Sequence, residues 1–182
     1  MSQIGIAMHN YESEHGALPP AAVTDKDGKP LLSWRVAILP FIEGDRLYQQ
    51  FHLDEPWDSP HNITLLDKMP PTFKTLARRM NPPPNTTYIQ VFAGKNTLFE
   101  PGKKFKLEDC ARGSSNTLLL IECGEPVPWT KPADIDIDPD GSFPQPKSVV
   151  PDIMRYITAD CSRHFFPLPL DESELRKLIW IR

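Results

Sequence analysis

The chain has 182 residues, a hydrophobic content of 40% and a formal net charge of −4, which suits one globular domain spanning residues 1–182. Nucleic-acid binding needs a localised basic footprint, and because the basic residues form no stripe or tail, we predict no nucleic-acid partner. Proline is unusually frequent: it accounts for 21 of the 182 residues, whereas about 5% of residues is usual. We therefore expect short elements joined by long, stiff loops.

An amphipathic helix is predicted at the start of the chain. Its stripe is formed by residues at helical spacing: Ile4, Met8, Tyr11, His15 and Leu18. Gly16 followed by Pro19 ends it. No capping residue precedes the pattern, so we expect this helix to be the tail of a longer one whose upstream segment is missing.

Short helices are predicted next. Ser33 caps one that runs to Phe41 and is bent or ended by Pro40, and Asp45 begins another turn. Residues 59–68 are predicted to form a third helix, with a cap and a proline at its start.

Strands are predicted in the second half. The segments 87–92 and 117–123 are rich in β-branched, aromatic or apolar residues, and the second suits a buried central strand. Residues 154–159 and 163–166 are expected to pair as a hairpin, and Asp171 to cap a final helix. Helices first and strands later indicate an α+β fold.

One short pattern resembles half of a calcium loop. Asp136, Asp138 and Asp140 precede Gly141 with the spacing of the first calcium ligands, but Lys147 stands where the bidentate glutamate belongs. We therefore favour an acidic, proline-rich surface loop and predict no metal site, with weak calcium binding as the alternative.

The residues that catalysis would need form no recognisable motif. The cysteines lack zinc or protease spacing, and phosphate-binding glycine loops and G-x-S-x-G are absent from the sequence. Glu122 lies in an apolar run, either as an acid with a perturbed pKa or, the favoured interpretation, as an acceptor of hydrogen bonds from arginine or backbone. We predict no enzyme activity and no cofactor.

Two tryptophans lie among prolines and polar residues. Trp57 and Trp129 either stack on a sugar or partner or pin their loops to the core. Pinning is favoured because large aromatic side chains are mostly buried. Together with Glu122 and Asp160 they are the candidate ligand-binding residues.

Five ordered blocks resemble a large planctomycete family of prepilin-like proteins, domain-of-unknown-function family 1559, which some classifications label as solute-binding. The blocks are Gln3–Tyr11 with His15–Gly16 and Leu18–Pro20, Ser33–Pro40, Leu53–Asn62, Gly113–Thr117 leading to Glu122, and Glu125–Pro132. The resemblance implies an upstream prepilin segment, the only membrane contact, and an extracytoplasmic domain whose helix packs on an antiparallel sheet with long proline-rich loops.

The resemblance also implies a function without chemistry: a pseudopilin-like binding or assembly module, with protein partners or self-assembly through the first helix. The alternative is an extracellular protein that binds a solute or glycan. The family usually closes with a His-x9-Asp-Gly signature, but here Val150 replaces the histidine and Cys161 the glycine, and Asp160 alone is kept.

Overall fold

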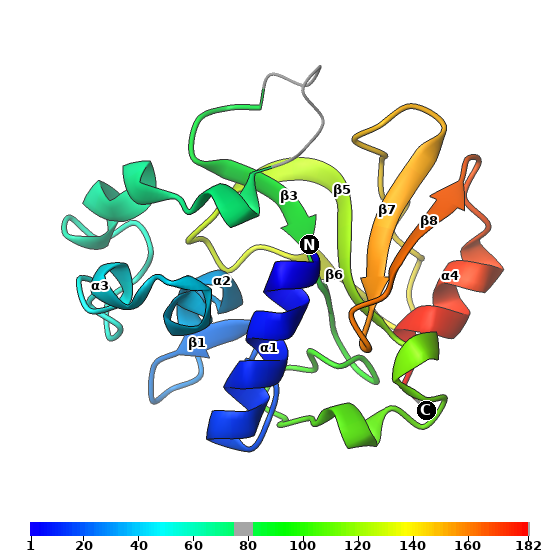
Figure 1. The fold of residues 1–182 in the computed structure, drawn as a ribbon, viewed down its shortest axis with the longest axis horizontal. Helices are drawn as coiled ribbons and strands as arrows, with labels where there is room; N and C mark the ends of the chain where they lie inside the picture. Colours follow the sequence, from blue (N-terminus) through cyan, green and yellow to red (C-terminus); the bar gives the residue numbers. More distant parts are fainter. Residues whose placement is uncertain (75–81, 182) are drawn as a thin grey trace.

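A four-stranded antiparallel sheet lies at the centre of the computed structural model, which describes residues 1–74 and 82–181 (Figure 1). Its strand order is β3-β5-β7-β8. The strands are β3 (Thr86–Gln90), β5 (Leu118–Pro128), β7 (Ile153–Thr158) and β8 (Arg163–Pro167). β5 is buried over its first six residues, as the apolar run predicts, and lies between β3 and β7.

Helix α1 (Ser2–His15) packs against this sheet. Ile4 and Met8 are fully buried, and Gly16, in the left-handed conformation, ends the helix as predicted. At Gly5 the approach is very close: an added Cβ would lie 2.7 Å from the Cys161 sulfur and 2.9 Å from an Ile157 methyl carbon. The first turn of α1 therefore fits the sheet because residue 5 has no side chain.

The first two of the three short helices predicted after α1, which begin at Ser33 and Asp45, are present in the structure. The Ser33 hydroxyl accepts a hydrogen bond from the Arg35 N–H and caps α2 (Trp34–Ala37). The 3₁₀ helix η1 (Leu39–Ile42) follows, with Pro40 in its first turn. Helix α3 (Asp45–Tyr48) comes next.

The helix predicted over residues 59–68 is present over part of that range, as the 3₁₀ helix η2 (Asn62–Lys68). The α-helical donors for the carbonyls of Leu66 and Asp67 would be Pro70 and Pro71, which have no N–H. The Leu66 carbonyl instead accepts a hydrogen bond from the Trp129 indole. Pro70 and Pro71 therefore prevent the segment from continuing as an α-helix past Lys68.

Four short strands have no counterpart in the sequence prediction. β1 (Ala22–Thr24) and β2 (Pro30–Ser33) form a hairpin around the loop at residues 25–29, and β4 (Phe92–Ala93) pairs in parallel with β6 (Ile135–Asp136). Strands of two to four residues are too short to show a periodicity. The remaining described elements are η3 (Pro71–Phe73), η4 (Leu107–Asp109) and η5 (Ser114–Asn116).

The C-terminal part follows the prediction. β7 and β8 form the hairpin, and Asp171 caps α4 (Glu172–Ile179) by accepting hydrogen bonds from two backbone N–H groups. Side chains of the sheet belong to two separate hydrophobic clusters. On β7, Ile157 packs in the cluster that includes residues of α1, and Met154 packs in the cluster that includes residues of α4. The two helices therefore cover opposite faces of the sheet.

The α+β prediction is confirmed, with an N-terminal helix on an antiparallel sheet and long proline-rich loops. Within residues 1–74 and 82–181, no helix combines the length and the apolar content that crossing a bilayer requires.

Candidate functional site

A hollow of about 450 Å³ opens on the sheet beside the start of α1. We call it the sheet hollow. Its wall includes the first three residues of the chain and side chains from β3, β5, β7 and β8. The residues that matter below are Lys74, Ile89, Glu122, Arg155, Ile157 and Arg163. They come from five separate segments, which strand pairing brings together.

An ion pair lies in the sheet hollow. Glu122 on β5 and Arg155 on β7 are direct cross-strand partners, with Arg155 Nη2 2.6 Å from Glu122 Oε2. This contact lacks hydrogen-bond alignment, and among the described residues Arg155 Nη2 and Nε, both buried, have no hydrogen-bond partner. Glu122 is 5% exposed. Of the two interpretations given from the sequence, the structure agrees with the one in which Glu122 pairs with an arginine.

The charges of the sheet hollow are mostly positive. Lys74, Arg155 and Arg163 contribute three cations to its described wall, against the single carboxylate of Glu122. Lys74 and Arg163 are exposed. The whole chain has a formal charge of −4, so this is a local basic region on an acidic protein.

Asp160 lies in the turn between β7 and β8 and is not among the residues that line the hollow. Its Oδ1 accepts hydrogen bonds from the Thr158 hydroxyl at 2.6 Å and from the Ser162 N–H at 3.0 Å. The hydrogen bond from Thr158, followed by that from Ser162, lowers the pKa of Asp160. These contacts make Asp160 a residue that shapes the turn.

Cys161 stands where the resemblance implies a glycine, and its backbone has a conformation that favours one. Its φ is +66°, the left-handed conformation that glycine adopts most easily. A side chain at this position is strained.

Replacing Cys161 with glycine should therefore raise the free energy of unfolding by about 0.5–1 kcal/mol, since a left-handed residue with a Cβ costs about 1–2 kcal/mol. Urea unfolding of the wild type and C161G measures the gain. Cys161→Ala is the matched control, because it removes the sulfur but keeps the Cβ. An equal gain in both variants would show that the sulfur, and not the backbone, is the source.

Cys161 and His9 are close, but their hydrogen bonding does not form a nucleophile and base. His9 Nε2 lies 2.7 Å from the Ala159 carbonyl oxygen and 3.5 Å from the Cys161 sulfur. A carbonyl only accepts, so Nε2 carries the proton and cannot take one from the thiol. Burial, followed by the charge of Asp160, raises the pKa of the Cys161 thiol. All three cysteines are free thiols.

The two candidate tryptophans lie outside the sheet hollow. Trp129 is fully buried between Phe51 and Phe73, and its indole N–H donates to the Leu66 carbonyl at 2.9 Å. No face remains for a sugar, so this residue pins loops to the core. Trp57 is half-buried, with the Lys131 ammonium 5.6 Å from its ring centroid.

The three aspartates of the calcium-like pattern do not form a cation site. Asp136 belongs to β6, and Asp138 accepts a hydrogen bond from the Asp140 N–H within its own turn. In the part of the chain that the structure describes, no three metal-ligating side chains come together. A calcium loop wraps around its ion, whereas here the backbone pairs with β4.

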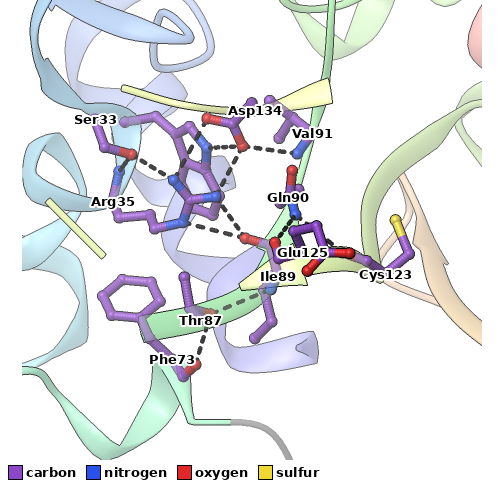
Figure 2. Close-up of polar contacts among 11 residues, drawn as sticks. Ser33, Arg35, Phe73, Thr87, Ile89, Gln90, Val91, Cys123, Glu125 and Asp134 are labelled. Carbon is purple, nitrogen blue, oxygen red and sulfur yellow. Dashed lines mark hydrogen bonds and ion pairs between the residues drawn. The ribbon is translucent and has the colours of Figure 1, made fainter. Parts of the chain in front are cut away.

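A buried ion pair that the sequence interpretation missed joins the Ser33–Trp34–Arg35 block to the sheet (Figure 2). Arg35 Nη2 lies 2.8 Å from Asp134 Oδ1 and 2.6 Å from the Ile89 carbonyl oxygen. Asp134 Oδ1 also accepts from the Trp34 indole and the Val91 N–H. The network connects α2, β3 and the segment before β6, and its role is structural.

Comparison with known proteins gives one match. The model of a family described as protein of unknown function (DUF1559) matches residues 1–92, which contain the first three of the five blocks. No curated protein matches the chain significantly, and neither does any solved structure.

Proposed function

The chain belongs to the DUF1559 family, and from that premise we propose that it is a pseudopilin-like binding or assembly module that works outside the cytoplasm and performs no chemistry. The observation that carries the proposal is the sheet hollow, which is open, charged and next to the start of α1. Its described wall contains no cysteine or serine with a base in hydrogen-bond reach. Binding is what such a surface can do.

A second candidate function is the binding of a small solute outside the cell. Small-molecule sites usually measure about 300–1,000 Å³, and the sheet hollow, at about 450 Å³, falls within this range. A glycan site built on tryptophan stacking has less support, because Trp129 has no exposed face.

Self-assembly through the first helix is part of the proposal. Ile6 on α1 is 53% exposed, although its neighbours Ile4 and Ala7 are fully buried. An exposed isoleucine on the outer face of the helix is suited to a contact with a partner or a second copy.

Binding is tested by a thermal-shift screen with a library of small solutes and with proteins from the cell envelope. Lys74→Trp places a bulky ring in the sheet hollow, and Lys95→Trp, at an exposed loop position, is its matched control. A ligand of the hollow should raise the Tm of the wild type and of K95W but not of K74W. If nothing in the screen binds the wild type, the proposed binding function fails.

Localisation is tested separately. The protein, expressed from its natural gene in its own host, should fractionate with the cell envelope and become accessible to protease once the outer layers are removed. Recovery in the cytosolic fraction, protected from protease, would contradict the extracytoplasmic proposal.

A further inference from the structure

We propose, resting on the binding function above, that the sheet hollow takes a small anionic solute whose carboxylate or phosphate group is bound by Arg155, Arg163 and Lys74. Three cations line the described part of the hollow, and its one acid, Glu122, already faces Arg155. Two positive charges therefore remain in excess. A hollow with charge of one sign concentrates ligands of the other.

Arg155 supplies a donor that still needs an acceptor. Its Nε is buried and has no hydrogen-bond partner among the described residues, and such a donor costs free energy unless an oxygen meets it. Water or a ligand can supply that oxygen. A carboxylate or phosphate fits best, since guanidinium groups bind planar oxyanions through charge-assisted hydrogen bonds.

The rest of the wall favours an organic anion over a bare ion. Met1 and Tyr156, which are both partly exposed, line the sheet hollow together with the buried Ile89 and Ile157, so part of its wall is apolar. A volume of about 450 Å³ is far larger than phosphate or sulfate requires. The expected ligand is therefore about the size of a hexose, with its anionic group at one end.

Isothermal titration tests this with glucuronate, glucose 6-phosphate and inorganic phosphate, against glucose and glucosamine as neutral and cationic counterparts of the same size. The wild type should bind at least one hexose-sized anion about tenfold or more tightly than glucose, and the affinity should fall as NaCl is raised. Glucuronate and glucose 6-phosphate separate the carboxylate source from the phosphate source. Equal binding of inorganic phosphate would overturn the organic part of the proposal.

Two sets of charge variants, expected to change the affinity in opposite directions, test the proposal. Lys74→Glu combined with Arg163→Glu changes two exposed residues and should lower the affinity for the anion at least about tenfold, while K26E combined with K95E, also exposed but outside the sheet hollow, should not. Glu122→Gln should tighten binding several-fold, because it removes the only acid of the described wall. A tighter complex is an effect that a loss of folding cannot produce.

The outcomes separate this inference from the function on which it rests. If glucose or glucosamine binds the wild type at least as tightly as the anions do and K74W abolishes that binding, the module binds at the hollow but does not select an anion, and the inference fails alone. If the solute screen and these probes all fail to bind, both fail together.

Discussion

Replacing Arg35 with methionine is expected to lower the free energy of unfolding by about 3–5 kcal/mol, the usual cost of leaving one member of a buried ion pair alone. The Arg35 and Asp134 side chains are 0% and 4% exposed. Without the guanidinium, the Asp134 carboxylate would keep, among the described residues, only the Trp34 indole and the Val91 N–H as donors. The Ile89 carbonyl would lose both of its arginine donors. Urea unfolding of the two proteins measures the difference.

The matched control replaces both charges. R35M combined with Asp134→Leu removes the ion pair without leaving a buried charge, so it should recover a large part of the loss seen in R35M alone. The difference between the double variant and the sum of the single variants gives the interaction energy of the pair. A loss in R35M below about 1 kcal/mol, the size of an exposed ion pair, would show that Arg35 is accessible to water.

Replacing Trp129 with alanine should cost a similar amount, about 3–5 kcal/mol, as for other large aromatic side chains in cores. The ring contacts Phe51 edge-on and Phe73 face to face, with centroid distances of 5.8 and 5.9 Å. These aromatic residues lie in the loop after α3 and in η3, so the variant weakens the attachment of two segments to the core. Chemical denaturation and near-ultraviolet circular dichroism report the loss.

Trp129→Phe separates ring packing from the indole hydrogen bond. It keeps an aromatic ring but leaves the Leu66 carbonyl without the donor it has in η2, so it should cost about 1–3 kcal/mol. A variant W129A that is as stable as the wild type but no longer binds its ligand would contradict the structural role and restore Trp129 as a binding residue.

Much of the fold was predictable because its signals are local. The stripe of α1, the cap of α4 at Asp171 and the apolar run of β5 are each contained in a few consecutive residues. The extent of β5 was not predictable: the strand continues to Pro128, although Pro126 and Gly124, with a φ of +82°, interrupt its pattern. Its pairing with β3 resumes after a register shift. A glycine and a proline inside a strand are a signal of such a bulge, but they do not show that pairing resumes beyond it.

The candidate site was predictable only in part. Glu122 was recognised as a carboxylate in an apolar strand, and the single arginine of β7 was the available signal for its partner. Pairing the two requires the register between β5 and β7, which includes an irregularity between Leu118 and Leu120. Lys74 and Arg163 join them from segments distant in the sequence, and nothing in their local sequence distinguishes these two residues from other surface cations.

The close contact at Gly5 has a mechanical consequence. The first turn of α1 lies against Ile157 and the Cys161 sulfur without room for even a methyl group, while the His9 imidazole lies 2.7 Å from the Ala159 carbonyl oxygen one turn later. Separating α1 from the β7–β8 hairpin would therefore require breaking the His9 contact and parting surfaces that meet without a gap at Gly5.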